Sequence, residues 1–272
     1  MPVERHVLLD RDGLLLADVC CGRPPRGWTE PRPATVFGLV LVRRGLVRGR
    51  VDGRERLLDP SSVYVERPGC EQQFSHPCGG DVYTEIVVSE TALADLLGGD
   101  PSVPEGLVFT TPDLSVAHRQ LLGRSRAEGT DGLEIAERVT ALAAQLLGRL
   151  APERVESGRP GTAAARRRLV DEARSALNDD PLLSLADVSR LVGCSPHHLS
   201  RVFSAVTGMT LTRYRNGLRV NRALEHLGDG ERDLARLAQD LGFTDQAHLT
   251  HVVRDLAGLP PGRLRSLLSG RG

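Results

Sequence analysis

The spacing of apolar positions changes about a third of the way along the chain. Over residues 1–90, short apolar runs are broken by glycine, proline and Asp-Gly, a pattern that is typical of short strands joined by tight turns. Asp52-Gly53 predicts a two-residue hairpin turn, because this dipeptide tolerates the positive φ angles that such a turn requires. Further turns are expected at Asp59-Pro60 and Pro68-Gly69. This part is therefore predicted to be a sandwich or a small barrel.

From Ser89 onwards the apolar positions follow a helical period. A short helix is expected after Ser89, then a strand at residues 107–110 and a helix that begins at Pro112. A longer helix is expected over residues 131–150, because its apolar residues recur on one side for about five turns. This stripe suits two roles equally: pairing two subunits, or packing on the helix's own barrel.

The segment 151–165 is polar and contains glycine and proline, so we predict a linker there. It separates a domain at residues 1–150 from a helical domain at residues 166–272. The helical domain contains one short unit twice, a helix followed by a glycine turn and a second helix. The two copies align Gly193 with Gly242, Leu199 with Leu249, Val202 with Val252, Gly208 with Gly258, and Arg215 with Arg265.

Both copies carry the local signals of a helix pair. Ser184 opens the first helix with a capping-box pattern, and Gly193 ends it. Ser195, followed by proline, opens the second helix. In the second copy Gly242 makes the corresponding turn. A single long helix over residues 211–227 is expected to join the two copies.

A helix–turn–helix places its second helix in the major groove of double-stranded DNA. The outer faces predicted for the two second helices are small, polar or basic and carry no acidic residue, which suits contact with phosphates and base edges. A bundle with a merely solvated polar face is the alternative, and two copies joined by one helix disfavour it. The candidate DNA contacts are His197, Ser200, Arg201 and Ser204 in the first copy, and Gln246, Ala247, Thr250, His251 and Arg254 in the second.

Roughly the last hundred residues resemble the DNA-binding domain of AraC-type transcriptional regulators. The resemblance runs through "HLSRVF" and "LARLAQDLGF" and implies seven helices, two of them recognition helices. His251 stands where arginine is usual, and a neutral histidine cannot make arginine's bidentate contact with guanine. The other departures are Ala247 in place of a usual serine, and Leu249 and Val253 in place of usual phenylalanines.

The N-terminal part is similar to the cupin-like effector and dimerisation domain of such regulators, through "RPATVFGLVLVRRGLVRGRVDG" and "YVERPGCEQQFSHPCGGD". The resemblance implies a small barrel that holds a small-molecule effector, helices that pair two subunits as a homodimer, and RNA polymerase as a further partner. The expected fold class is α+β multidomain, a cupin-like β-barrel plus helices followed by an all-α domain with two helix–turn–helix units. Candidate effector contacts are Trp28, Phe37, Tyr64 and His76, although single aromatic residues in a barrel more often belong to the core.

Composition adds a charge asymmetry to this picture. The 272 residues contain 35 basic residues, all arginine, and 35 acidic ones. Residues 160–272 hold 16 arginines and 12 acidic residues, which is compatible with a nucleic-acid partner for the C-terminal part. No apolar stretch is long enough to cross a membrane, and the N-terminus does not resemble a signal peptide. We therefore expect a cytoplasmic protein without a membrane partner.

The cysteines keep a second class of function open, a regulator that senses a thiol oxidant or a soft metal. Ordinary reduced thiols are favoured, because the chain has no Cys-x-x-Cys. A cupin-type metalloenzyme is a more remote alternative, since Glu71 and His76 are too few ligands for a metal site. No nucleophile, phosphate-loop or zincin motif is recognised, so we expect no enzyme, cofactor or metal. The sensor alternative would use Cys20, Cys21, Cys70 and Cys78.

Overall fold

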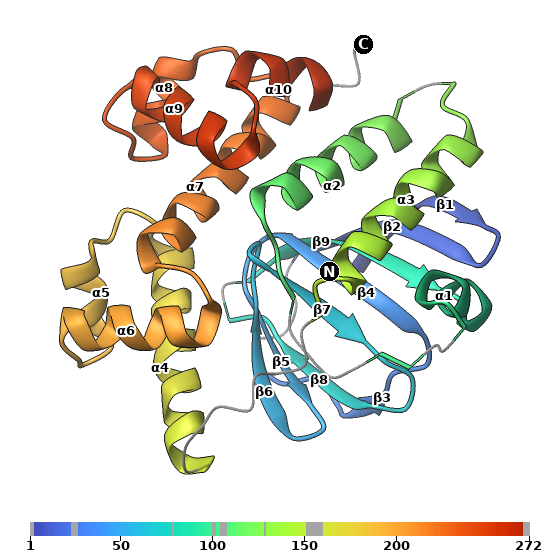
Figure 1. Ribbon diagram of the computed structural model, residues 1–272, viewed down its shortest axis with the longest axis horizontal. Helices are drawn as coiled ribbons and strands as arrows, with labels where there is room; N and C mark the ends of the chain where they lie inside the picture. The colour runs from blue at the N-terminus through green and yellow to red at the C-terminus, as the bar shows by residue number, and fades with distance from the viewer. Residues whose placement is uncertain are drawn as a thin grey trace. The chain divides into compact units, whose positions relative to one another are not determined.

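The computed structural model describes residues 3–22, 27–77, 79–99, 102–103, 108–127, 129–150 and 160–268 (Figure 1). The chain divides into two compact units, residues 1–153 with 266–272 and residues 154–265. The first is built on strands and the second on helices. The helix α4 (Pro160–Asp179) begins inside the segment expected to be a linker, and the earlier residues 151–159 lie outside the described residues. The domain boundaries at 150 and 166 stay predictions.

Two antiparallel sheets form the first unit, in agreement with the β-rich part that the sequence predicts. The six-stranded sheet has the order β1 (Val3–Arg11), β2 (Leu14–Cys21), β9 (Asp81–Val88), β4 (Phe37–Arg44), β7 (Ser62–Glu66) and β10 (Val108–Phe109). The four-stranded sheet has the order β3 (Arg32–Pro33), β8 (Glu71–Ser75), β5 (Val47–Val51) and β6 (Arg54–Leu58). Both sheets are open, because the first and last strand in each order do not pair with one another.

The tight turns between the strands follow from local chemistry. Asp52 and Gly53 have φ angles of 46° and 76° and join β5 to β6, which confirms the predicted hairpin. The same dipeptide at Asp12 and Gly13, with φ angles of 51° and 77°, joins β1 to β2. Our sequence interpretation missed this second hairpin, although the signal is the same.

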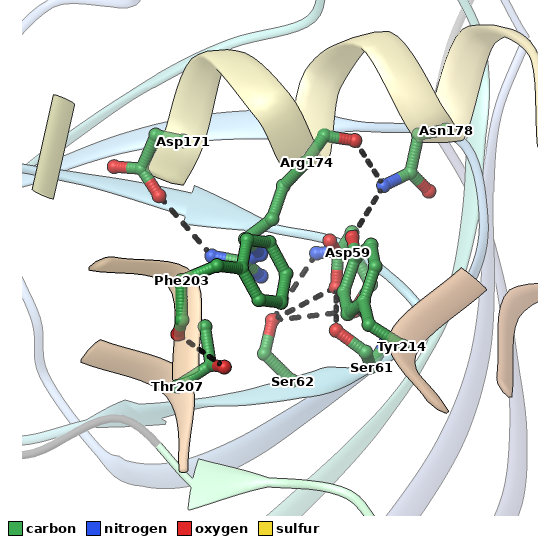
Figure 2. A network of polar contacts seen from close by, with 9 residues as sticks. All are labelled: Asp59, Ser61, Ser62, Asp171, Arg174, Asn178, Phe203, Thr207 and Tyr214. Carbon is green, nitrogen blue, oxygen red and sulfur yellow. Dashed lines mark hydrogen bonds and ion pairs between the residues drawn. The ribbon is translucent and has the colours of Figure 1, made fainter. Parts of the chain in front are cut away.

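The predicted turn at Asp59-Pro60 is held by its own side chains, which Figure 2 draws as sticks. The Asp59 carboxylate Oδ1 accepts hydrogen bonds from the Ser61 amide at 2.9 Å and from the Ser61 hydroxyl at 2.6 Å. The Ser62 amide donates to the Asp59 carbonyl at 3.0 Å. These bonds satisfy the polar groups of a buried turn between β6 and β7.

One face of the six-stranded sheet carries the main core of the first unit. Leu16, Leu39 and Ile86 are fully buried there, and α1 (Glu90–Leu97), α2 (Pro112–Ser125) and α3 (Gly132–Leu147) contribute to the same core. Among the two roles considered for the stripe of α3, the structure shows packing on the helix's own unit. The buried stripe consists of Ile135, Ala136, Val139, Leu142, Ala143, Leu146 and Leu147.

Residues 160–268 contain the seven helices that the resemblance implies. After α4 they are α5 (Leu185–Leu191), α6 (Pro196–Thr207), α7 (Leu211–Gly228), α8 (Leu234–Asp240), α9 (Gln246–Ala257) and α10 (Pro261–Leu268). The long helix α7 runs between the α5–α6 pair and the α8–α9 pair (Figure 1). Among the described residues, no helix is long and apolar enough to span a membrane.

Aromatic and amide contacts fix α4 against α6 and α7. The rings of Phe203 and Tyr214, both fully buried, meet edge to face with centroids 5.3 Å apart. Asn178 of α4 donates from Nδ2 to the Tyr214 hydroxyl at 2.9 Å and to the Arg174 carbonyl at 2.9 Å (Figure 2). The Arg174 guanidinium pairs with Asp171 at 3.2 Å on the same helix. The first helix–turn–helix is therefore anchored to a polar and aromatic core.

Leu146 and Leu133 lie on opposite faces of α3 and provide a stability test. Leu146→Ala should lower the free energy of unfolding of the first unit by about 2–5 kcal/mol, because it empties a fully buried site. Leu133→Ala should change it by less than about 0.5 kcal/mol, because Leu133 is 49% exposed. Urea unfolding followed by the fluorescence of Trp28, the single tryptophan, reports on this unit. Equal losses for the two variants would contradict the assignment of the stripe to the core.

Candidate nucleic-acid interface

Local capping bonds position the first helix pair. The Ser184 hydroxyl accepts from the Asp187 amide at 3.2 Å while the Asp187 carboxylate accepts from the Ser184 amide at 3.1 Å, which confirms the capping box at the start of α5. Gly193, with φ of 68°, makes the turn. Ser195 then caps α6 by accepting from the His198 amide at 3.2 Å.

Helix α6 has one buried and one outward face. Leu199, Val202 and Phe203 are buried in the core of the second unit. The four predicted outer residues lie three or four positions apart and so share the other face. His197 and Arg201 are exposed there, and Ser200 and Ser204 are half-buried. The structure therefore brings the four candidate contacts of the first copy together.

The second helix pair repeats this construction. The Asp233 carboxylate caps α8 by accepting from the Arg236 amide at 2.9 Å, and Asp245 caps α9 by accepting from the His248 amide at 2.7 Å. Gly242, with φ of 70°, makes the turn between them. Both pairs therefore rely on the same two devices, a capped second helix and a left-handed glycine.

The outer face of α9 is hollowed, whereas its inner face is packed. Leu249 and Val253 are fully buried although phenylalanine is usual at both positions in the family, and Val252 is 8% exposed. A hollow of about 500 Å³ lies on the opposite side of the helix. It is lined by the five candidate contacts of the second copy, Gln246, Ala247, Thr250, His251 and Arg254.

The charges on the two outer faces suit an anionic partner. Arg201 on α6 and Arg254 on α9 are exposed, and neither forms an ion pair with another residue in the part of the chain that the structure describes. Their guanidinium groups are therefore not neutralised there and are available to phosphates or to guanine. An acidic residue, Asp255, is exposed elsewhere on α9 but does not line the hollow.

The aligned arginines of the two copies brace the fold rather than face outward. Arg215 donates from Nη1 to the Leu183 carbonyl at 3.1 Å, just before α5. Arg265 donates from Nη1 to the Glu231 carbonyl at 3.3 Å, just before α8. Each arginine therefore ties the end of its copy to the loop that leads into the same copy.

The four candidate effector contacts do not all share a surface. Phe37 lies in the core between the six-stranded sheet and its helices, whereas Tyr64 belongs to a separate cluster on the other face. His76 Nδ1 lies 2.6 Å from an oxygen of the buried Asp81 carboxylate. The Arg50 guanidinium carbon lies 4.3 Å from the centre of the Trp28 ring. Each of Trp28, Tyr64 and His76 thus contacts a different polar or charged partner. Phe37 is a core residue.

A chain of hydrogen bonds around Tyr64 was not predicted from the sequence. The Tyr64 hydroxyl donates to Gln72 Oε1 at 2.7 Å, and Gln72 Nε2 donates to Glu66 Oε1 at 2.6 Å. Burial raises the pKa of the Glu66 carboxyl, with Gln72 opposing the shift and Glu85 adding to it. The available signal was the alternation in "SVYVE", which places the glutamate on the same side of the strand as the tyrosine and the two valines on the other side.

The cysteines do not assemble into a site among the described residues. Cys78 lies outside those residues, Cys20 and Cys70 are half-buried, and Cys21 is buried. Burial raises the pKa of the Cys21 thiol to about 11, with Asp81 and Cys20 adding to the shift, so the reactive thiolate is disfavoured. Within the described residues, no group of three or more His, Cys, Asp or Glu side chains is placed to hold a metal ion.

Comparisons with known proteins all include the helix–turn–helix part of the chain or most of the chain. A family model described as "Helix-turn-helix domain" matches residues 188–266. The arabinose operon regulatory protein of Escherichia coli K12 is 23% identical over 242 residues, which cover 85% of this chain and 80% of that protein. The multiple antibiotic resistance protein MarA of the same strain is 31% identical over 83 residues, which cover 30% of this chain and 65% of MarA.

A solved structure has a similar level of sequence identity to part of the chain. It is a transcriptional regulator with an AraC-type DNA-binding domain from Chromobacterium violaceum, 25% identical, and the match covers 40% of this chain and 99% of that one at a TM-score of 0.37. The matched helix–turn–helix model and the named relatives agree with the paired, capped helices described above. Residues 188–266 are therefore a helix–turn–helix domain that is similar to the corresponding part of AraC-type transcriptional regulators.

Proposed function

We propose that the chain reads a two-part DNA site by placing α6 and α9 in successive major grooves. The observation that carries this proposal is the repeated construction, two capped helices with buried inner faces and polar or basic outer faces, joined by α7. Successive major grooves on one side of the duplex lie about 34 Å apart, which corresponds to roughly ten base pairs. One subunit should therefore recognise two short elements whose centres are separated by about one turn of DNA.

The proposed contacts divide into base readers and phosphate binders. Arg201 is the candidate for a guanine, because its planar fork can donate to both acceptors that guanine presents in the major groove. Gln246 and Thr250 are the candidates for base edges in the second element. The remaining contacts are assigned to phosphates, sugars or further base edges, and they are His197, Ser200, Ser204, Ala247, His251 and Arg254.

The first unit is proposed to bind a small-molecule effector between its two sheets. The chain of hydrogen bonds from Tyr64 through Gln72 to Glu66 supports this, because it places polar groups on a face that is otherwise lined by apolar side chains. An effector can act only through different affinities for two arrangements of the protein. Mass spectrometry of small molecules released from the purified, denatured chain tests the proposal, and a unit that releases none and binds none counts against it.

The wider organisation follows from the resemblance and the relatives. We assign residues 1–150 to the effector domain, 151–165 to the linker and 166–272 to the DNA-binding domain. A homodimer would read two of the two-part sites, and RNA polymerase is the further partner expected of a regulator that acts at promoters. The chain is proposed to act in the cytoplasm, without a membrane partner, and to have no enzymatic activity, because its named relatives are regulators.

Arg201 provides the first test of the proposed recognition of a two-part DNA site. Arg201→Ala should weaken binding to the preferred site by about 1–3 kcal/mol and relax base preference at the first element only, because one bidentate contact is lost. Gln246→Ala and Thr250→Ala should relax preference at the second element only. Binding-site selection with each variant and the wild type measures both effects.

A matched control comes from an arginine that braces the fold. Arg265→Ala removes a bond to the Glu231 carbonyl and should weaken binding to all sequences alike. The proposal would be wrong if Arg201→Ala left base preference unchanged, or if the wild-type site were confined to a single groove.

The adjacent cysteines provide a test of the thiol-sensor alternative. Replacing Cys20 and Cys21 together with serine should leave DNA affinity and transcriptional response unchanged, because burial raises the pKa of the Cys21 thiol and disfavours a reactive thiolate in this pair. A promoter–reporter assay with and without a thiol oxidant measures the response. A folded double variant that loses its response would favour the sensor over the small-molecule regulator.

A further inference from the structure

Three arginines on one side of α7 hold the chain that precedes the first helix pair. Arg222 Nη2 donates to the Asn178 carbonyl at 2.7 Å, Arg219 Nε to the Pro181 carbonyl at 3.2 Å, and Arg215 Nη1 to the Leu183 carbonyl at 3.1 Å. Positions four and three apart share one face of a helix, so the three side chains follow one another along α7. The carbonyls belong to the end of α4 and the loop before α5, which helix geometry leaves without helical partners.

Arg219 differs from the other two because it also reaches the second helix pair. Its guanidinium carbon lies 5.5 Å from the centre of the Phe243 ring, and Phe243 directly follows the turn between α8 and α9. Arg219 is 7% exposed and Phe243 is 4% exposed, so the charge and the ring face one another away from water. A cation over an aromatic ring is attracted more strongly when both are desolvated.

A second contact joins the loop before α5 to the turn between α8 and α9. Leu182, in the loop held by the arginines, packs against Gly242, so that a methyl group on Gly242 would overlap the Leu182 side chain. The same methyl group would lie 3.2 Å from Arg219 Nη2. The aligned Gly193 has nearly the same φ, 68° against 70°, but nothing lies within 4 Å of the corresponding position. The close contact is therefore specific to the turn of the second pair.

We propose that Arg219 is a positioning residue that fixes the separation of the recognition helices α6 and α9, and so the spacing between the two DNA elements. This inference rests on the proposed two-groove reading of DNA. Helix α7 is joined to each pair through a short loop, at residues 208–210 and 229–233, and a loop leaves a helix pair free to tilt. Arg219 removes this freedom because one guanidinium binds a carbonyl beside the first pair and also lies over the Phe243 ring, directly after the turn of the second pair.

The guanidinium group suits this double contact. It is planar, so it can donate in its plane to the Pro181 carbonyl while its central carbon lies over the Phe243 ring. A leucine at this position would keep some of the packing but would lose both contacts. The expected result is a second helix pair that tilts relative to the first, with each recognition helix still intact.

The experiment measures the affinity of the full chain for duplexes that contain the two selected elements at separations shifted by up to three base pairs. The wild type should prefer its best separation over the shifted ones by about tenfold or more, in line with the effect of a mismatched base pair. In Arg219→Leu this preference should fall below about threefold. Arg222→Leu, which loses only the bond to the Asn178 carbonyl beside the first pair, should keep the wild-type preference.

A pair of glycine variants provides an independent route to the same readout. Gly242→Ala and Gly193→Ala impose similar backbone strain, because both positions have positive φ. Only Gly242→Ala displaces Leu182 and crowds Arg219. Only this variant should therefore weaken the dependence of DNA affinity on the separation of the two elements. These two variants decide the question if Arg219→Leu does not fold, as judged by circular dichroism.

The outcomes separate the inference from the function on which it rests. A folded Arg219→Leu with the wild-type preference, or equal preferences in the two glycine variants, would overturn the role of Arg219 and leave the two-groove reading intact. A wild type that binds a single element as tightly as two elements at any separation would overturn the two-groove reading itself. Loss of the preference for one separation in Arg219→Leu and in Gly242→Ala, with Arg222→Leu and Gly193→Ala unchanged, would support the role of Arg219 and the two-groove reading.

Discussion

Backbone carbonyls that lack a helical partner need another hydrogen-bond donor, and in the second unit arginine side chains provide it. Arg215 and Arg265, at aligned positions of the two copies, each donate to a carbonyl just before the first helix of their own copy. The repeat along the sequence is thus also a repeat of this interaction. Because these bonds hold each helix pair against the helix that follows it, the direction in which α6 and α9 present their outer faces depends on them.

The recognition helices combine a packed inner face with an outer face that carries the proposed chemistry. Leu249 and Val253 fill their buried positions in α9 without the phenylalanines that are usual in the family, so a smaller side chain is accommodated there. On the outer face the departures are His251 and Ala247, which line the hollow of α9. The inner substitutions therefore preserve the helix pair, while the outer ones bear on which bases the second element contains.

The first unit shows how one sheet can serve two purposes. The face that carries Leu39 and Phe37 packs on the helices, including the apolar stripe of α3, and forms the largest core. The opposite face carries Tyr64 and the polar chain through Gln72 to Glu66. Because side chains alternate along a strand, neighbouring residues such as Phe37 and Gly38 belong to different environments. Of the four candidate effector contacts, Tyr64 therefore lies on the face that the helices do not cover, whereas Phe37 lies on the covered face.

Features that depend on residues within a few positions of one another could be predicted from the order of the amino acids. The caps at Ser184 and Ser195, the hairpin at Asp52-Gly53 and the left-handed Gly193 were predictable, because their hydrogen bonds and φ angles are set locally. Three features became visible only in the folded chain: the stripe of α3 packs on its own unit, Phe37 belongs to the core, and Arg219 lies over the Phe243 ring. Periodicity shows that a face is apolar, but the partner of that face comes from distant segments whose approach is set by the packing of the whole unit.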